Sequence, residues 1–308
     1  MGNSIAYYIA KSQPDVSVIL VDPVGIAPGA SSKAGGFLAK EWRDGTPLES
    51  MQRLGFELHQ QLADDLGSDR IGYRRLTCHS VGVGGTDDYE NVDNSDDNVE
   101  WADLNVIGSV SMGNEDVIAQ VHPRKLCEAM WQEVSKSPGA ELRKGRIVKA
   151  LTEPISNEDS SEFSVTGVEL EDGSILETDV LVVACGPWTE EARSWFPSGT
   201  QRLPEITSVK CHSMLVQPKS KQVYDQAVFF ESSDDDILHH AAGLEVYPRP
   251  DGDCYVNGFE GDEGLVAERP GEEEVVNEDI ELMKEAMRQT SSQLGDVEPH
   301  TTQVSFSI

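Results

Sequence analysis

The chain opens with a helix-forming segment followed by a short apolar strand segment, and this order restricts the fold more than any other feature. Over residues 3–12, apolar residues at helical spacing predict one face of a helix: Ile5, Ala6, Ile9 and Ala10. The mostly β-branched run 16–21 then predicts a strand covered on both faces, as in a parallel sheet. Parallel strands need crossover connections, so this opening favours an α/β fold.

The strand run ends at Asp22, 20 positions after Gly2. In a dinucleotide-binding βαβ unit, the third glycine of G-x-G-x-x-G opens the helix, and an acidic residue about 20 positions later binds the ribose hydroxyls. We therefore expect the chain to begin at that third glycine, without the first strand and the first two glycines. Taken alone, Asp22-Pro23 fits an ordinary strand-ending turn equally well.

The rest of the chain alternates helix and strand signals. Helical patterns cover residues 48–66, 123–135 and 272–294, the last with an apolar stripe predicted to face the core: Val276, Ile280, Met283 and Met287. A second buried-strand run lies at 179–184, and 141–150 is expected to pair with 163–170. Beyond residue 204, short strands predict an antiparallel sheet: 208–217, 227–231, 244–248 and 254–258.

The charge excludes two classes of partner. A net charge of −31 would repel nucleic acids and anionic membrane surfaces. The acidic clusters at 87–103, 234–236 and 272–274 are interpreted as solvated loops and helix starts. The five cysteines are irregularly spaced, without a C-x-x-C pair, which argues against a zinc site and favours a reducing, cytoplasmic location. No apolar run approaches the roughly 20 residues of a membrane-spanning helix.

Four segments, in order, resemble motifs of the D-amino-acid oxidase and glycine oxidase family of FAD-dependent oxidoreductases. They are the Gly/Ala/Ser-rich run 29–36, Val-His-Pro-Arg-Lys-Leu at 121–126, the strand and turn at 179–189, and the hairpin at 247–258. His122 stands where the family motif has Asp. As a whole, the sequence most resembles a eukaryotic branch of this family.

The resemblance implies FAD as the cofactor and a set of binding residues. Backbone amides of 29–36 can approach phosphate or flavin oxygens without steric cost, and serine hydroxyls there can donate to them. Packing alone would also explain Ile147, Cys185 and Trp188. The expected cofactor-binding residues are Gly2, Asp22, Pro23, Gly29, Ala30, Ser31, Ser32, Gly35, Gly36, Ile147, Cys185, Gly186 and Trp188.

Catalysis in this family moves a hydride from a C–N bond or related carbon to the flavin, so no protein nucleophile is required. Arg249 is the candidate catalytic residue, because a guanidinium binds a substrate carboxylate bidentately; it is equally compatible with a structural role. His212 and the pair His239-His240 are weaker candidates for the same face.

The fold class is therefore α/β, or α+β overall: a Rossmann-like FAD/NAD(P)-binding domain lacking its first strand, with a mainly antiparallel substrate domain. We expect residues 1–75 and 120–203 to form the discontinuous cofactor domain, and 76–119 and 204–308 the substrate domain. The family's C-terminal flavin-binding segment also has no counterpart after residue 294. We expect a fragment or truncated gene product that binds FAD weakly or not at all.

The leading function is FAD-dependent oxidation of an amine or amino-acid-like small molecule. One alternative is a flavin-fold protein without turnover, acting as an interaction or trafficking module. A second alternative is an NAD-type dehydrogenase, because Asp22 would serve NAD as well as FAD. The Gly/Ser loop and the Cys-Gly-Pro-Trp turn at 185–188 are typical of flavin enzymes and weigh against it.

Overall fold

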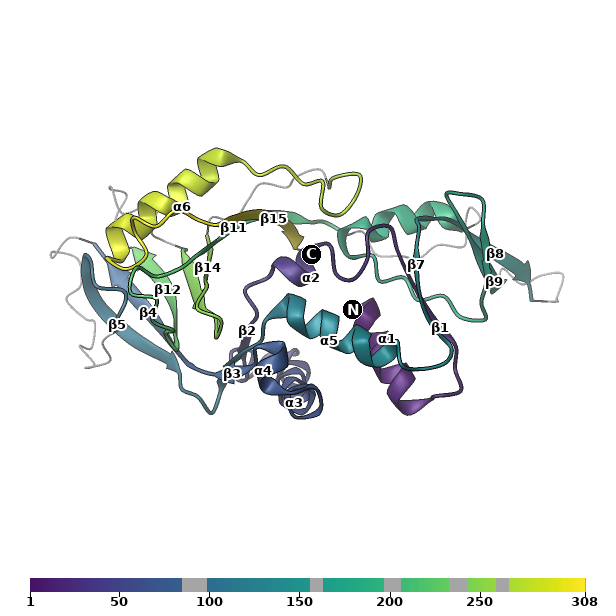
Figure 1. Ribbon diagram of the computed structural model, residues 1–308, viewed down its shortest axis with the longest axis horizontal. Helices are drawn as coiled ribbons and strands as arrows, with labels where there is room; N and C mark the ends of the chain where they lie inside the picture. The colour runs from purple at the N-terminus through teal and green to yellow at the C-terminus, as the bar shows by residue number, and fades with distance from the viewer. Residues whose placement is uncertain (85–98, 156–162, 197–205, 233–242, 259–265, 308) are drawn as a thin grey trace.

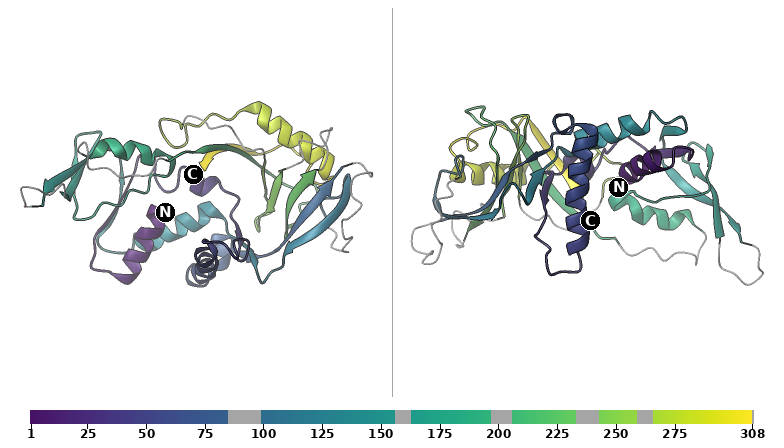
Figure 2. Two further views of the ribbon diagram at one scale, coloured as in Figure 1. Left: turned by 180° about the vertical axis from the view of Figure 1, so that it is seen from behind. Right: turned by 90° about the horizontal axis from the view of Figure 1, so that it is seen from below.

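The computed structural model describes residues 1–84, 99–155, 163–196, 206–232, 243–258 and 266–307. The molecule is elongated in Figure 1, with a seven-stranded sheet and α6 at one end and β1, β7, β8 and β9 at the other. Helices α1, α3, α4 and α5 lie between the two ends, and Figure 2 shows the same arrangement from behind and from below. The predicted mixture of a short parallel ladder and a large, mainly antiparallel sheet is confirmed.

The opening helix and strand form where the sequence predicts them. Helix α1 spans Gly2–Ser12, and β1 (Val18–Asp22) pairs in parallel with β7 (Ala140–Lys144). The prediction that the first strand run is covered on both faces is wrong, because Val16 is 43% exposed and Ile19 is 38% exposed. One face of β1 is packed, since Val18 joins the core around α1 and Leu20 lies near Gly2, whereas Ile19 projects from the other face.

The predicted buried strand at 179–184 is not a strand in the structure. Its residues make no ladder with any described strand, and Val180 and Val182 are 73% and 51% exposed. An extended run acquires strand geometry by exchanging backbone hydrogen bonds with a neighbour, and here the described chain provides none. The run leads into η1, a 3₁₀ helix at Gly186–Trp195.

The expected single strand at 141–150 breaks at Gly145-Arg146. β7 joins β1, whereas β8 (Ile147–Pro154) forms a separate antiparallel sheet with β9 (Phe163–Leu170) and β10 (Ile175–Glu177). The predicted pairing of this segment with 163–170 is confirmed for β8 alone. η1 packs on β8 through a small core that contains Ala150, Ala192 and Trp195.

Three helices and a small sheet fill the middle of the molecule. Helix α3 spans Glu49–Leu66, α4 Ser68–Ile71 and α5 Pro123–Val134, and proline at the first helical position of α5 suits its missing N–H. The short helix α2 (Ala30–Lys33) precedes a three-stranded sheet, ordered β2 (Phe37–Ala39), β6 (Ile118–Gln120) and β3 (Arg74–Arg75).

The seven-stranded sheet is ordered β15-β11-β14-β13-β12-β4-β5. Its strands are β4 (Thr77–Val83), β5 (Val106–Gly113), β11 (Val209–Val216), β12 (Gln226–Ser232), β13 (Glu245–Pro248), β14 (Cys254–Asn257) and β15 (Thr301–Ser307). Helix α6 (Asn277–Thr290) covers one face. The opposite face packs on β2 and β6 through a core that includes Leu76, Ile118 and Tyr247.

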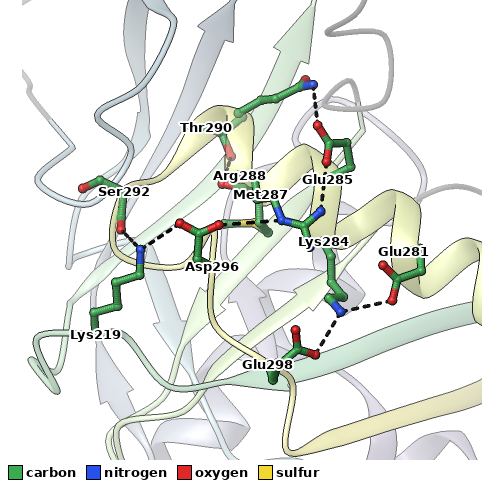
Figure 3. Close-up of polar contacts among 11 residues, drawn as sticks. Lys219, Glu281, Lys284, Glu285, Met287, Arg288, Thr290, Ser292, Asp296 and Glu298 are labelled. Carbon is green, nitrogen blue, oxygen red and sulfur yellow. Dashed lines mark hydrogen bonds and ion pairs between the residues drawn. The ribbon is translucent and has the colours of Figure 1, made fainter.

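The stripe on α6 enters the core as predicted, with Ile280 at 6% exposure and Met283 and Met287 at 0%. Val276 is the exception, since it precedes the first helical turn and is 39% exposed. Figure 3 shows ion pairs that fasten the outer side of α6 to the segment that follows it. Lys284 contacts Glu298 at 2.9 Å, but these carboxylates are largely exposed, so each pair stabilises the fold only weakly.

Strand β15 is absent from the sequence-based prediction. Thr301–Ser307 pairs antiparallel with β11 over seven residues, and Val304 and Phe306 are buried. The alternation of polar and apolar residues at 301–306 was the available signal. No helix among the described residues is long and apolar enough to span a membrane.

Candidate cofactor site

The start of α1 lies against the two segments expected to contact a nucleotide. A Cβ atom added to Gly2 would stand 3.4 Å from the Ala184 Cβ atom and 3.5 Å from the Leu20 Cδ1 atom. The helix therefore begins close to β1 on one side and to the 179–185 run on the other. Small residues at positions 2 and 184 permit this approach.

Asp22 ends β1 with its side chain half-buried. The Oδ1 atom accepts hydrogen bonds from the backbone N–H groups of Val24 and Gly25, both at 2.8 Å, while Oδ2 has no hydrogen-bonding partner among the described residues. Burial raises the pKa of Asp22, and these two N–H donors oppose the rise. One carboxylate oxygen thus fixes the turn that includes Pro23, and the other is unpaired among the described residues.

The glycine-rich loop, defined as residues 29–36, packs on the ring of Trp188. A Cβ atom at Gly29 would stand 3.3 Å from the Trp188 ring, whose Nε1–H donates to the Ala267 carbonyl at 2.8 Å. Trp188 therefore holds the loop in place through packing. Ala30 begins the short helix α2 directly after this contact.

The two serines of this loop differ. Ser31 is exposed, and its hydroxyl has no partner among the described residues. Ser32 is buried; its hydroxyl donates to the Gly29 carbonyl at 3.3 Å and accepts from Arg124 Nη2 at 3.4 Å. Ser31 is thus free to donate to a ligand, whereas Ser32 stabilises the loop itself. The role of Arg124 is missing from the sequence-based prediction, although it lies in the 121–126 motif.

Close packing explains the two glycines at the end of the loop. A Cβ atom at Gly35 would stand 2.3 Å from the Tyr247 ring. Gly36 has φ +81°, and its Cβ atom would lie 1.9 Å from the Val121 carbonyl oxygen. Both positions therefore require glycine because the loop crosses directly over β13 and the start of α5.

Residues 185–186 lie beside Asp22. Burial raises the pKa of the Cys185 thiol, and the negative charges of Glu191 and Asp22 add to the rise. A buried thiol with a raised pKa is a poor redox partner, which supports a packing role. Gly186 has φ +57° and open space beyond its Cα atom, and Ile147 packs with Cys185 against the same small core.

Arg249 is 3% exposed and joins the sheet to the glycine-rich loop. Its Nη2 atom donates to the Ala34 carbonyl at 3.1 Å, and its guanidinium lies 5.3 Å from the centroid of the Tyr255 ring. The Nε atom is buried without a hydrogen-bonding partner among the described residues. One N–H donor of a buried cation therefore remains unused beside the loop.

His212 lies away from this region, on the α6 side of the sheet. It is 4% exposed, its Nδ1 atom contacts Asp279 at 2.9 Å, and its Nε2 atom accepts from the Val276 N–H. These partners anchor the start of α6, so the structure gives His212 a structural role. His239 and His240 lie outside the described residues, as does the acidic cluster 234–236.

The interpretation of 272–274 as a solvated acidic cluster is wrong for Glu273, whose side chain is 2% exposed. Its carboxylate pairs with Lys33 of α2 at 2.8 Å, and the same Lys33 Nζ donates to the Val304 carbonyl. Trp101, inside the acidic stretch 87–103, is also fully buried. Contacts between residues 240 positions apart carry no local sequence signal, which is why the Lys33–Glu273 pair was missed.

These contacts bring Gly2, Asp22 and 184–188 together with the glycine-rich loop, which reaches Tyr247 and Arg249 of the large sheet. A family model described as FAD dependent oxidoreductase matches residues 1–305. The protein therefore belongs to this family, and it is an FAD-dependent oxidoreductase with FAD as its cofactor.

The relatives agree with this membership. The chain is 29% identical over 280 residues to "Putative oxidoreductase C1F5.03c" of Schizosaccharomyces pombe, a match that covers 86% of this chain and 69% of the relative. The glycine oxidase structure from Bacillus cereus gives a TM-score of 0.72 at 20% identity, covering 99% of this chain and 79% of that one. The L-proline dehydrogenase structure from P. horikoshii gives 0.72 at 15% identity, covering 99% and 78%.

The residues present fit the adenine dinucleotide chemically. An acceptor oxygen on Asp22, the Ser31 hydroxyl and the open backbone at Gly186 match a ligand with both hydroxyls and anionic oxygens. Among the described residues, no cluster of His, Cys, Asp and Glu is suited to a metal ion. The family match assigns a flavin nucleotide, which decides against the NAD-type alternative.

Proposed function

We propose that this enzyme oxidises a small amine or amino acid by hydride transfer to FAD. The observation that carries the proposal is the buried Arg249, whose unused Nε–H lies beside the glycine-rich loop. The structural neighbours named for glycine oxidase and L-proline dehydrogenase act on substrates that carry both an amine and a carboxylate. A buried guanidinium is suited to holding such a carboxylate.

We propose the division of the chain expected from its sequence. Residues 1–75 and 120–203 would form the cofactor domain, and 76–119 and 204–308 the substrate domain. The separate hydrophobic cores support it: one contains Tyr7, Phe56 and Met130, and another contains Phe230 and Met283. A cytoplasmic location is also proposed, because the five cysteines, all among the described residues, are free thiols.

Within the cofactor domain, the thirteen residues expected from the sequence are proposed to form the FAD site, some by direct contact and others by supporting it. Direct contact is proposed for Asp22, Ser31, Gly186 and the backbone of the loop. Ser32 and Trp188 would act by holding that backbone, because their polar groups already bond to protein. Ile147 would act by supporting Cys185 in the small core that η1 forms on β8. Gly2, opposite Ala184, permits the close approach of α1 to the 179–185 run, and Cys185 would pack in the small core beside it.

Bound FAD supplies the hydride acceptor, and the protein supplies position and a dry environment. Tyr247, Tyr255, Phe37 and Phe229 form a cluster of rings between the loop and the sheet, with Phe37 and Tyr247 stacked at 5.2 Å. Such a cluster excludes water from the face on which a substrate would lie. Arg249 would fix the substrate carboxylate, and no protein nucleophile is needed.

The test uses the purified protein loaded with FAD and checked by its visible absorbance. Anaerobic mixing with amino acids and with the corresponding amines without a carboxylate should bleach the flavin absorbance. Arg249→Lys should raise KM at least tenfold for the amino acids and leave the simple amines unaffected, because only the former present a carboxylate. Equal loss for both substrate types would assign Arg249 a structural role, and no bleaching with any of them would refute the proposed reaction.

A further inference from the structure

Helix α5 carries an arginine at the edge of the glycine-rich loop. Arg124 follows the proline that opens α5, is exposed to solvent, and donates from Nη2 to the Ser32 hydroxyl at 3.4 Å. Three residues further along α5, the Cys127 thiol faces the Ser31 carbonyl at 3.9 Å. Residues three apart lie on one side of a helix, so this side of α5 faces the loop.

The same side of α5 contacts the start of α1. The Asn3 Nδ2 atom donates to the Cys127 carbonyl at 2.7 Å, and α5 packs on both α1 and α2 (Figure 1). The first turn of α1 contains no acidic residue, and no side chain caps its backbone N–H groups. Cys127 therefore connects the loop to a helix end that favours negative charge.

Arg124 differs from the other basic side chains that contact this loop. Lys33 pairs with Glu273 at 2.8 Å, and Arg249 is 3% exposed, with its guanidinium beside the Tyr255 ring. Arg124 forms no ion pair with any described residue, although the chain has a net charge of −31. Its positive charge is therefore available to a ligand that approaches the loop.

The proposed flavin contacts contain no positive side chain. Of the thirteen residues proposed to form the FAD site, Asp22 alone is charged, and it is acidic. FAD carries a negatively charged pyrophosphate, and the field of a strongly acidic protein opposes the approach of such an anion. Backbone N–H groups supply only partial charges, so a full positive charge beside the loop would favour binding.

We propose that Arg124 binds the pyrophosphate of FAD, together with the start of α1 and the Ser31 hydroxyl. This role rests on the proposed flavin contacts and adds to them the charge that they lack. A guanidinium presents its N–H donors in a planar fork that suits phosphate oxygens. The bond to Ser32 holds the side chain beside the loop and leaves its other N–H donors for the ligand.

Binding of FAD to the flavin-free protein, followed by quenching of flavin fluorescence, tests this role. Arg124→Met should weaken FAD binding about tenfold, and Arg124→Lys should lose less because it keeps the charge. The affinity of Arg124→Met should also depend less on ionic strength than that of the unchanged protein. Arg43→Met is the matched control, because Arg43 is exposed, lies beyond β2 and forms no ion pair with any described residue.

A purely structural role for Arg124 would give a different result. Arg124→Met would then lose thermal stability together with affinity, Arg124→Lys would be no better, and the dependence on ionic strength would stay the same. That pattern would overturn the proposal. Unchanged FAD affinity in Arg124→Met, an equal loss in Arg43→Met, or no FAD binding by the unchanged protein would overturn it too.

Two comparisons separate this proposal from the proposed function. If Ser31→Ala weakens FAD binding and Arg124→Met does not, the role of Arg124 fails and the loop contact stands. If Arg124→Met weakens FAD binding as expected but no amine or amino acid bleaches the flavin, the proposed reaction fails alone.

Discussion

Gly36→Ala provides the sharpest test of how the glycine-rich loop is built. At φ +81°, an alanine costs about 1 kcal/mol relative to glycine. The new Cβ atom would also lie 1.9 Å from the Val121 carbonyl oxygen, so the loop and the start of α5 must separate by roughly an ångström. That movement breaks the Val121 N–H to Gly36 carbonyl bond and strains the β2–β6 ladder, adding about 2 kcal/mol.

Gly173→Ala is the matched control, because Gly173 has the same φ of +81° but nothing within 4 Å of the added Cβ atom. Urea unfolding should show a loss of about 3 kcal/mol for Gly36→Ala and about 1 kcal/mol for Gly173→Ala. Gly36→Ala should also weaken FAD binding, measured by quenching of flavin fluorescence. Equal stability losses in the two variants would refute the proposed steric contact.

Three further predictions concern buried charges and thiols. Burial and nearby cations lower the pKa of His122 to about 4, so the unfolded chain binds its proton more readily, and stability should fall by up to about 3 kcal/mol as pH drops from 6.5 to 4. Denaturant titrations at a series of pH values check this, and the unfolding free energy of His122→Asn should depend less on pH. Glu273→Gln should destabilise by about 3 kcal/mol in thermal unfolding by leaving Lys33 buried and unpaired; a loss below 1 kcal/mol would contradict the pairing. Cys78 and Cys254, whose pKa values are raised to about 12 by burial, should resist a thiol reagent at pH 8 until urea unfolds the protein, and rapid labelling beforehand would show that they are accessible.

Periodic patterns predicted the helices and most strands, because the spacing of apolar residues within each element is a local property of the sequence. The helices at 2–12, 49–66 and 123–134 match their predicted ranges closely. The strand predicted at 179–184 is absent because strand formation also depends on a distant partner. Apolar, β-branched residues indicate a capacity to form a strand, but a strand also needs a hydrogen-bonding neighbour. A single sequence does not reveal whether that neighbour is present.

The glycine-rich loop shows the same difference between local and long-range information within the candidate site. Its small residues were recognisable, yet the reason for Gly35 is the Tyr247 ring, more than 200 positions away. Similarly, nothing local distinguishes the exposed Ser31 from the buried Ser32. Residue types therefore predicted the region, and long-range contacts decide what each residue does there.

The glycine-rich loop is held almost entirely by residues synthesised long after it. Lys33 is fixed by Glu273 and by the Val304 carbonyl, and Gln303 donates to the Lys33 carbonyl at 2.8 Å. On a translating ribosome, the loop therefore emerges without the partners that shape it. The shape of the loop is complete only once β15 has emerged and folded back against it.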